Sequence, residues 1–181
     1  MSCLSAGCLH TNRPVELAAA DRNAPPVMNE RFLRGGRLVV EVDWLAGCAP
    51  NDGALDALRA WLARETARAP GDIEVRRGRE VARGAGDGLN AVTSTVLANA
   101  HRAEDAYFVY VLYWDHFEKY RGLTFPGIEL DARIDFPVVA MMTDAVRHDS
   151  MLWMTRRKVE SAVLVHEFGH VAGLVSSGRR V

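Results

Sequence analysis

The sequence has few cysteines, no long apolar run and no excess of charge of one sign. Its three cysteines, Cys3, Cys8 and Cys48, are too few and too scattered for a disulfide scaffold or a cysteine-based zinc site. The longest apolar run, residues 106–114, is about half of what a membrane-spanning helix needs. With 22 Lys+Arg against 23 Asp+Glu, the net charge of −1 gives no reason to expect nucleic acid or an anionic membrane as partner.

What remains is ordinary globular composition. Apolar residues make up 49% of the chain and charged residues 25%, which excludes wholesale disorder. A chain of 181 residues is long enough for one domain with a well-buried core.

The first 36 residues differ from the rest, because they contain several prolines and their apolar residues do not recur at a regular helix or strand spacing. We expect an irregular leader at 1–36 and the folded domain at 37–181. Within the leader, Leu4-Ser5-Ala6-Gly7-Cys8 is similar to the end of a bacterial lipoprotein signal, although only seven residues precede Cys8. Two interpretations stay open. The true start lies upstream and Cys8 carries a lipid anchor outside the cytoplasm, or the match is chance and the protein is cytoplasmic.

Apolar patterns predict the order of the first elements. Strands at 38–44 and 72–76 flank a helix at 54–67, a unit that predicts a right-handed crossover and a parallel strand pair. A second helix covers 89–101. The continuous apolar run at 106–114 is typical of a central strand that is covered on both faces.

The second half of the chain adds two strands and a long helix. The segment 122–130 contains one proline and two glycines, so it is an edge strand or an extended loop. Residues 135–142 form a further strand, and 155–174 form a long helix that stops at Gly173. The fold class is α/β (α+β): a twisted mixed sheet of four or five strands with two or three helices. The helix at 155–174 is expected to be the longest and the most buried.

The last helix carries the motif His166-Glu167-Phe168-Gly169-His170. Positions i and i+4 share one helix face, so both imidazoles can reach a single cation, and neutral imidazole is a good zinc ligand. Glu167 is displaced around the helix and is placed to act as a general base on a water. The pattern meets the requirements of metal-assisted hydrolysis. The alternative is that the three side chains form hydrogen bonds inside the core without a metal.

Together with Gly173, this motif resembles the active-site helix of the metzincin-type zinc metallopeptidases, H-E-x-x-H-x-x-G-x-x-H/D. It is also similar to a group of bacterial metallopeptidases, many of which have lipoprotein leaders. The resemblance extends to the order of elements over roughly residues 37–175 and implies a zincin-like N-terminal subdomain. It implies Zn²⁺ as cofactor, hydrolysis of peptide bonds, His166 and His170 as metal ligands, and Glu167 as catalytic base.

The same resemblance implies where a substrate lies. In that fold the edge strand lines the cleft and pairs with an extended peptide, a mode with a physical basis in strand addition. The expected substrate edge is therefore the start of the 122–130 segment, comprising Gly122, Leu123, Thr124 and Phe125.

The sequence departs from the family at the third metal ligand. Ser176 stands where the family has histidine or aspartate, and no histidine or carboxylate follows before Val181. His116 and His148 are poor substitutes, so the third ligand is unknown. We therefore expect a truncated member that lacks most of the C-terminal subdomain and binds zinc weakly. The alternative function is an inactive remnant that acts at most as a binding module.

Overall fold

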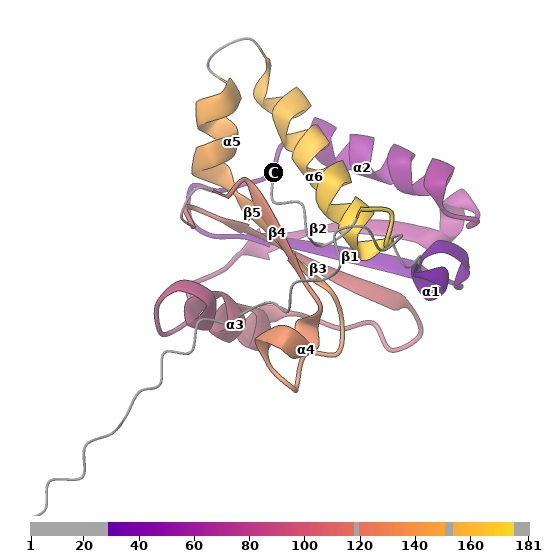
Figure 1. Cartoon of the computed structure of the whole chain (residues 1–181), viewed down its shortest axis with the longest axis horizontal. Helices are drawn as coiled ribbons and strands as arrows, with labels where there is room; N and C mark the ends of the chain where they lie inside the picture. Colours follow the sequence, from indigo (N-terminus) through magenta and orange to yellow (C-terminus); the bar gives the residue numbers. More distant parts are fainter. Residues whose placement is uncertain (1–28, 118–119, 151–153, 176–181) are drawn as a thin grey trace, which may run out of the picture.

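The computed structural model describes residues 29–117, 120–150 and 154–175, which form one sheet between two layers of helices (Figure 1). The strands are β1 Leu38–Trp44, β2 Ile73–Glu80, β3 Tyr107–Trp114, β4 Gly122–Phe125 and β5 Val138–Met142. The helices are α1 Glu30–Arg34, α2 Asp52–Glu65, α3 Gly88–Asn99, α4 Gly127–Leu130, α5 Thr143–Ser150 and α6 Arg156–Val171, with a 3-10 turn at Pro70–Asp72.

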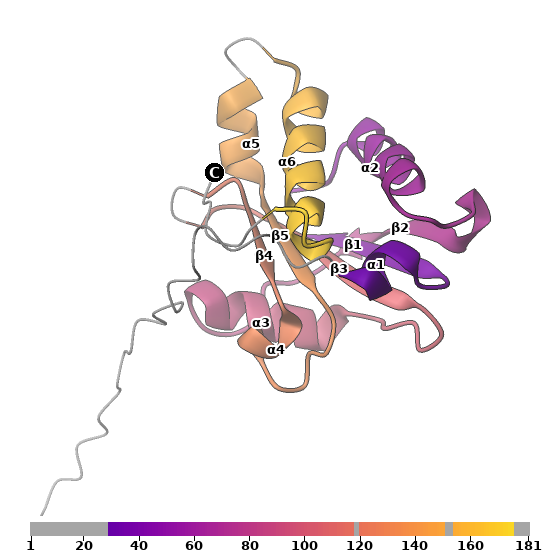
Figure 2. The same cartoon turned by 45° about the vertical axis from the view of Figure 1, so that its right-hand side comes forward.

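The sheet has the order β2-β1-β3-β5-β4, in which β4 alone is antiparallel to its neighbour. Helices α2, α5 and α6 cover one face, and α3 and α4 lie on the other (Figures 1 and 2). The two-layer covering explains why β3 and β5 are built from apolar residues throughout, since both of their faces are enclosed. The mixed α+β class and the central position of β3 are confirmed.

Helix α6 packs against α2, α5 and the β5–β4 side of the sheet. It is the longest helix among the described residues, at 16 residues, and it buries more side chains than the others do. Its outer side remains in contact with solvent at Arg157, Lys158 and Ala162, so the helix is not enclosed all round.

Several expected boundaries need correction. The described part of the chain has six α-helices rather than two or three. Five residues of the stretch expected to be irregular, Glu30–Arg34, form α1, because Phe32 and Leu33 are buried there. The segment 122–130 is a strand only to Phe125, and Gly127–Leu130 then forms the short helix α4.

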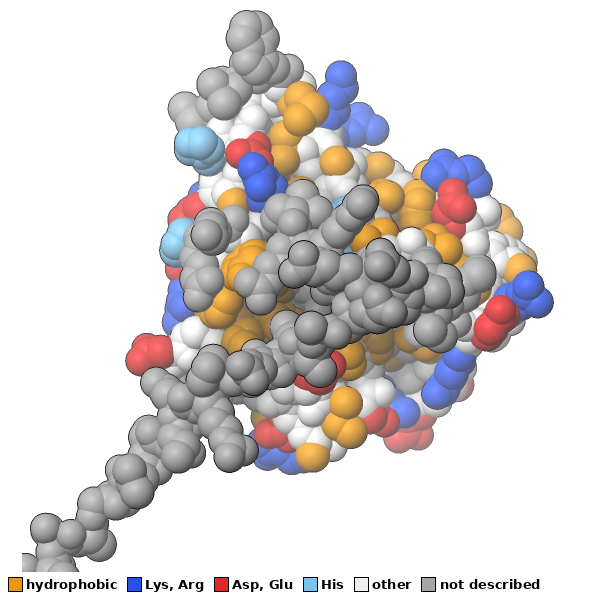
Figure 3. Space-filling view, viewed as in Figure 1, with side chains coloured by type: hydrophobic (Ala, Val, Ile, Leu, Met, Phe, Trp, Pro, Cys, Tyr) orange, Lys and Arg blue, Asp and Glu red, His pale blue; other side chains and the backbone are white. Residues whose placement is uncertain are grey.

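Strand β5 begins at Val138, three residues later than expected, and α5, which was not expected, follows it directly. The lipoprotein interpretation of Cys8 and the departure at Ser176 both lie outside the described residues. In the portion that is described, no helix is long and apolar enough to cross a membrane. Figure 3 shows side chains of both charge signs around the rim of one face, as the balanced composition suggests.

A buried carboxylate fixes the first half of α6. The side chain of Glu160 is 1% exposed and accepts hydrogen bonds from Asn51 N at 2.7 Å, Tyr113 Oη at 2.9 Å and Arg156 Nε at 3.2 Å. Burial, followed by the adjacent carboxylate, raises the pKa of Tyr113 well above its usual range, so the phenol keeps its proton and donates. The network joins α6 to β3 and to the start of α2.

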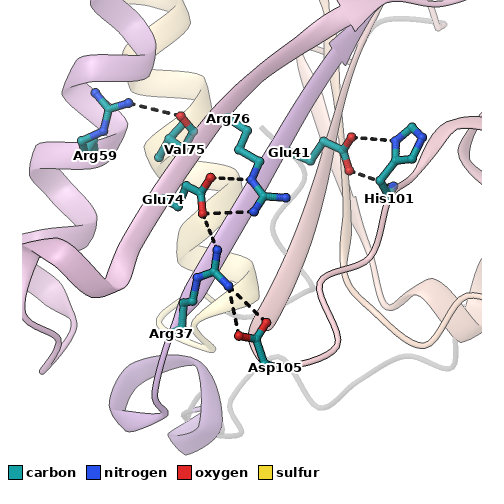
Figure 4. A network of polar contacts seen from close by, with 8 residues as sticks. All are labelled: Arg37, Glu41, Arg59, Glu74, Val75, Arg76, His101 and Asp105. Atoms are coloured by element: carbon teal, nitrogen blue, oxygen red, sulfur yellow. Dashed lines mark hydrogen bonds and ion pairs between the residues drawn. The ribbon is translucent and has the colours of Figure 1, made fainter.

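A second polar network lies on the β1–β2 side of the sheet, away from α6 (Figure 4). Glu74 accepts hydrogen bonds from Arg76 and Arg37, and Arg37 also reaches Asp105. These hydrogen bonds, that from Arg76 first, lower the pKa of Glu74 to about 2. The side chains remain well exposed to solvent, so the network contributes little to stability at high salt.

We predict that Glu160→Ala lowers the free energy of unfolding by about 3 kcal/mol, because it leaves the buried Tyr113 hydroxyl without an acceptor. Urea unfolding followed by tryptophan fluorescence measures the difference. Glu80→Ala, at the exposed end of β2, is the control and should change the free energy by less than about 0.5 kcal/mol. Equal effects of the two substitutions would contradict the assigned role of Glu160.

Glu74 supplies a pH-dependent contribution. Because its pKa is lower in the folded chain than the ordinary value of 4.5, its stabilisation is present above that value and is lost as the pH falls towards about 2. Glu74→Gln should therefore lower the urea midpoint at pH 7 but not at pH 2. The difference at pH 7 should shrink in about 1 M NaCl, and a difference that persists at pH 2 would refute the assignment.

Candidate metal and catalytic site

The two predicted metal ligands converge at the C-terminal half of α6. The Nε2 atoms of His166 and His170 lie 3.2 Å apart, and the ring centroids are 4.8 Å apart with perpendicular planes. Two nitrogens that are each about 2.0–2.1 Å from one tetrahedral zinc ion are separated by roughly 3.3 Å. The donor types and their separation therefore fit two ligands of one zinc ion.

The turn that follows α6 sets the orientation of the second histidine. Gly173 has a positive φ of 71° and the backbone N–H of Val175 donates to Gly169 O at 3.2 Å, so the chain folds back over the helix end. As a result, the carbonyl of Val175 lies 3.2 Å from Nδ1 of His170. A carbonyl only accepts, so Nδ1 of His170 donates in this contact, and the lone pair of its Nε2 is left to accept from Nε2 of His166 or to bind a metal.

The environment also favours the neutral form of this histidine. Burial lowers the pKa of His170, and the nearby His166 acts in the same direction, while Glu167 and the Val175 carbonyl partly oppose them. Neutral imidazole is the form that binds a metal.

The predicted catalytic base lies between α6 and the edge strand. Glu167 is 5% exposed, whereas the flanking His166 and His170 are half-buried. Its Oε2 accepts a hydrogen bond from Thr124 Oγ1 at 2.7 Å, and its Oε1 packs against Gly122. The carboxylate thus lies beside the histidine pair in sequence and against β4 in space.

The expected substrate edge is the strand β4, made of Gly122, Leu123, Thr124 and Phe125. It pairs with β5 along one side, with Thr124 opposite Val139, and it is the last strand in the sheet order. All four residues are half-buried, and the strand contacts α6. The edge position of this segment is confirmed; its use by a substrate stays a prediction.

The other histidines of the described residues, 101, 116 and 148, do not join the pair. His116 is exposed directly after β3, and His148 is exposed on α5. His101 is bonded through Nδ1 to Glu41 on the opposite side of the sheet (Figure 4). Within the described residues, no three His, Cys, Asp or Glu side chains come together as a metal-binding group. This part of the chain therefore brings together two candidate ligands.

Sequence reasoning missed the groups that orient the motif. The contact between Thr124 and Glu167 joins residues 43 positions apart, so no local pattern predicts it. Glu160 carried a usable signal, because it lies seven residues before Glu167 and therefore on the same side of the helix. Gly173, at the predicted end of the helix, was the sequence signal for the turn that returns the Val175 carbonyl.

Comparison with known proteins gives no relatives: no family model matches the chain, and neither a curated protein nor a solved structure is significantly similar to it.

We predict that the histidine pair binds zinc and that each imidazole contributes. His166→Ala or His170→Ala should weaken zinc binding at least about tenfold, measured by competition with a chromophoric chelator, because one of two ligands is lost. His116→Ala is the matched control, since His116 is exposed and outside the pair. Equal losses of zinc affinity in all three variants would contradict the assignment of His166 and His170 as the ligands.

Proposed function

We propose that the protein is a zinc-dependent peptidase in which His166 and His170 hold the metal and Glu167 is the general base. The observation that carries the proposal is the convergence of the two Nε2 atoms at 3.2 Å, with a buried carboxylate at the adjacent helix position. The resemblance of the motif to the metzincin active-site helix supports the same assignment.

Zinc held by the two imidazoles would supply Lewis acidity, which polarises a carbonyl and lowers the pKa of water towards neutrality. The protein's own contribution to the proton transfers is Glu167. Because Oε2 already accepts a hydrogen bond from the Thr124 hydroxyl, we assign the proton transfer to Oε1. Oε1 takes a proton from the attacking water and passes it to the amine nitrogen as the C–N bond breaks.

Strand β4 gives the proposal its substrate class. An edge strand can add an extended peptide through main-chain hydrogen bonds, and β4 is the edge strand that contacts α6. A peptide paired along β4 would lie beside Glu167, whose carboxylate already contacts Gly122 and Thr124. The proposed substrate is therefore an extended segment of peptide or unfolded protein.

The alternative function is a binding module without catalysis. It is favoured by one observation, which is that the described residues bring together two metal ligands and not three. Catalytic zinc sites generally use three protein ligands and keep one position open. Under this alternative, the chain keeps the sheet and the edge strand but holds zinc too weakly to hydrolyse a peptide.

The test is cleavage of a mixture of quenched fluorescent peptides by the purified chain with added zinc. We predict that Glu167→Gln lowers kcat by at least about 100-fold, because it removes the proton acceptor and keeps the shape of the side chain. Glu80→Gln, on the opposite edge strand, should leave the rate unchanged. Cleavage that survives Glu167→Gln would refute the assigned mechanism. No cleavage by the wild-type chain, with weak zinc binding, would support the binding module.

A further inference from the structure

Two residues of β4 contact the same carboxylate from the sheet side. Thr124 Oγ1 lies 2.7 Å from Glu167 Oε2 and 3.1 Å from the main-chain oxygen of Glu167. A Cβ placed on Gly122 would lie 2.7 Å from Oε1 and 2.8 Å from Cγ of the same side chain. Because Gly122 and Thr124 are two positions apart on a strand, the Thr124 side chain and the Cβ position of Gly122 lie on the same face of the sheet, which α6 covers.

The two contacts restrict the carboxylate in complementary ways. The hydroxyl holds Oε2 through a hydrogen bond to a charged acceptor, which is stronger than a neutral one. The missing side chain at 122 leaves the space that Oε1 and Cγ occupy. With an exposure of only 5%, Glu167 has little room to adopt another rotamer.

We propose that Gly122 and Thr124 are positioning residues that hold the Glu167 carboxylate in the orientation needed for proton transfer. The inference rests on the proposed function, and it adds a role for the edge strand other than pairing with a peptide. Their side-chain positions face α6, whereas a peptide would pair with the outer backbone edge of β4. Changes at the two positions should therefore affect the chemical step and leave peptide binding nearly unchanged.

The chain offers well-matched variants. Thr124→Val removes the hydroxyl and keeps the shape, and Thr124→Ser keeps the hydroxyl. Gly122→Ala inserts a methyl group 2.7 Å from Oε1, 2.8 Å from Cγ and 2.9 Å from Cδ of Glu167, so the Glu167 side chain must shift. Thr93→Val is the control, because its hydroxyl donates only to the Leu89 carbonyl within α3, on the other face of the sheet (Figure 2).

The first measurement does not depend on activity. A double-mutant cycle of Thr124→Val and Glu167→Ala is run by urea unfolding of the metal-free full chain. We expect the two changes to be coupled by at least about tenfold in the unfolding equilibrium constant, since the hydrogen bond has a charged acceptor. The cycle of Thr93→Val with Glu167→Ala should show no coupling. A Thr124–Glu167 coupling below about twofold would overturn the proposal, and Glu167→Met, which has a similar shape and no strong acceptor, replaces Glu167→Ala if the latter does not fold.

The second measurement separates positioning from structural support. In the zinc-loaded chain, Thr124→Val and Gly122→Ala should each lower kcat by about tenfold or more with KM within about twofold, and Thr124→Ser should restore the rate. Equal losses for Thr124→Ser and Thr124→Val, or a change in KM alone, would overturn the proposal. If the wild-type chain cleaves no peptide, the proposed function is contradicted, and the cycle still decides whether β4 fixes Glu167.

Discussion

The arrangement depends on two carboxylates that α6 buries against the sheet. Glu160 and Glu167 are seven residues apart on one side of the helix, and a buried carboxylate is tolerated only where donors surround it. Glu160 receives three donors from β3, the start of α2 and its own helix, while Glu167 receives the Thr124 hydroxyl from β4. These contacts fix both the depth and the rotation of α6, and therefore the direction in which His166 and His170 point.

The rotation of the helix explains the different environments along the motif. Turning Glu167 towards β4 places the histidines on the adjacent side, where they are half-buried and their Nε2 atoms converge. The turn at Gly173 then returns the Val175 carbonyl to His170 and selects its tautomer. Three separate parts of the chain, β4, α6 and the turn after it, are needed to produce an arrangement that the pentapeptide alone only suggests.

Much of the fold follows from the sequence because its signals are local. The apolar run ending at Trp114 predicted the central strand, and the i, i+4 histidines predicted one shared helix face. Helix α5 was not predicted because it is mostly polar and buries only Thr143 and Val146. Helix α1 was not predicted because five residues are too few to show a helical repeat of apolar residues, although tertiary contacts bury Phe32 completely. Apart from Arg156, which lies four residues before Glu160 on the same helix, the donors to Glu160 and Glu167 could not be predicted, since each joins residues far apart in sequence.

The two edges of the sheet differ in a way that bears on the proposed substrate. Strand β2 carries charged side chains along its exposed half, and the Val75 carbonyl accepts a hydrogen bond from Arg59 of α2 (Figure 4). Such charges are how proteins keep an edge from pairing with another strand. Strand β4 has the uncharged sequence Gly-Leu-Thr-Phe and contacts the helix that bears the histidines. If a peptide adds to this sheet, the charge pattern therefore directs it to β4, the edge beside Glu167.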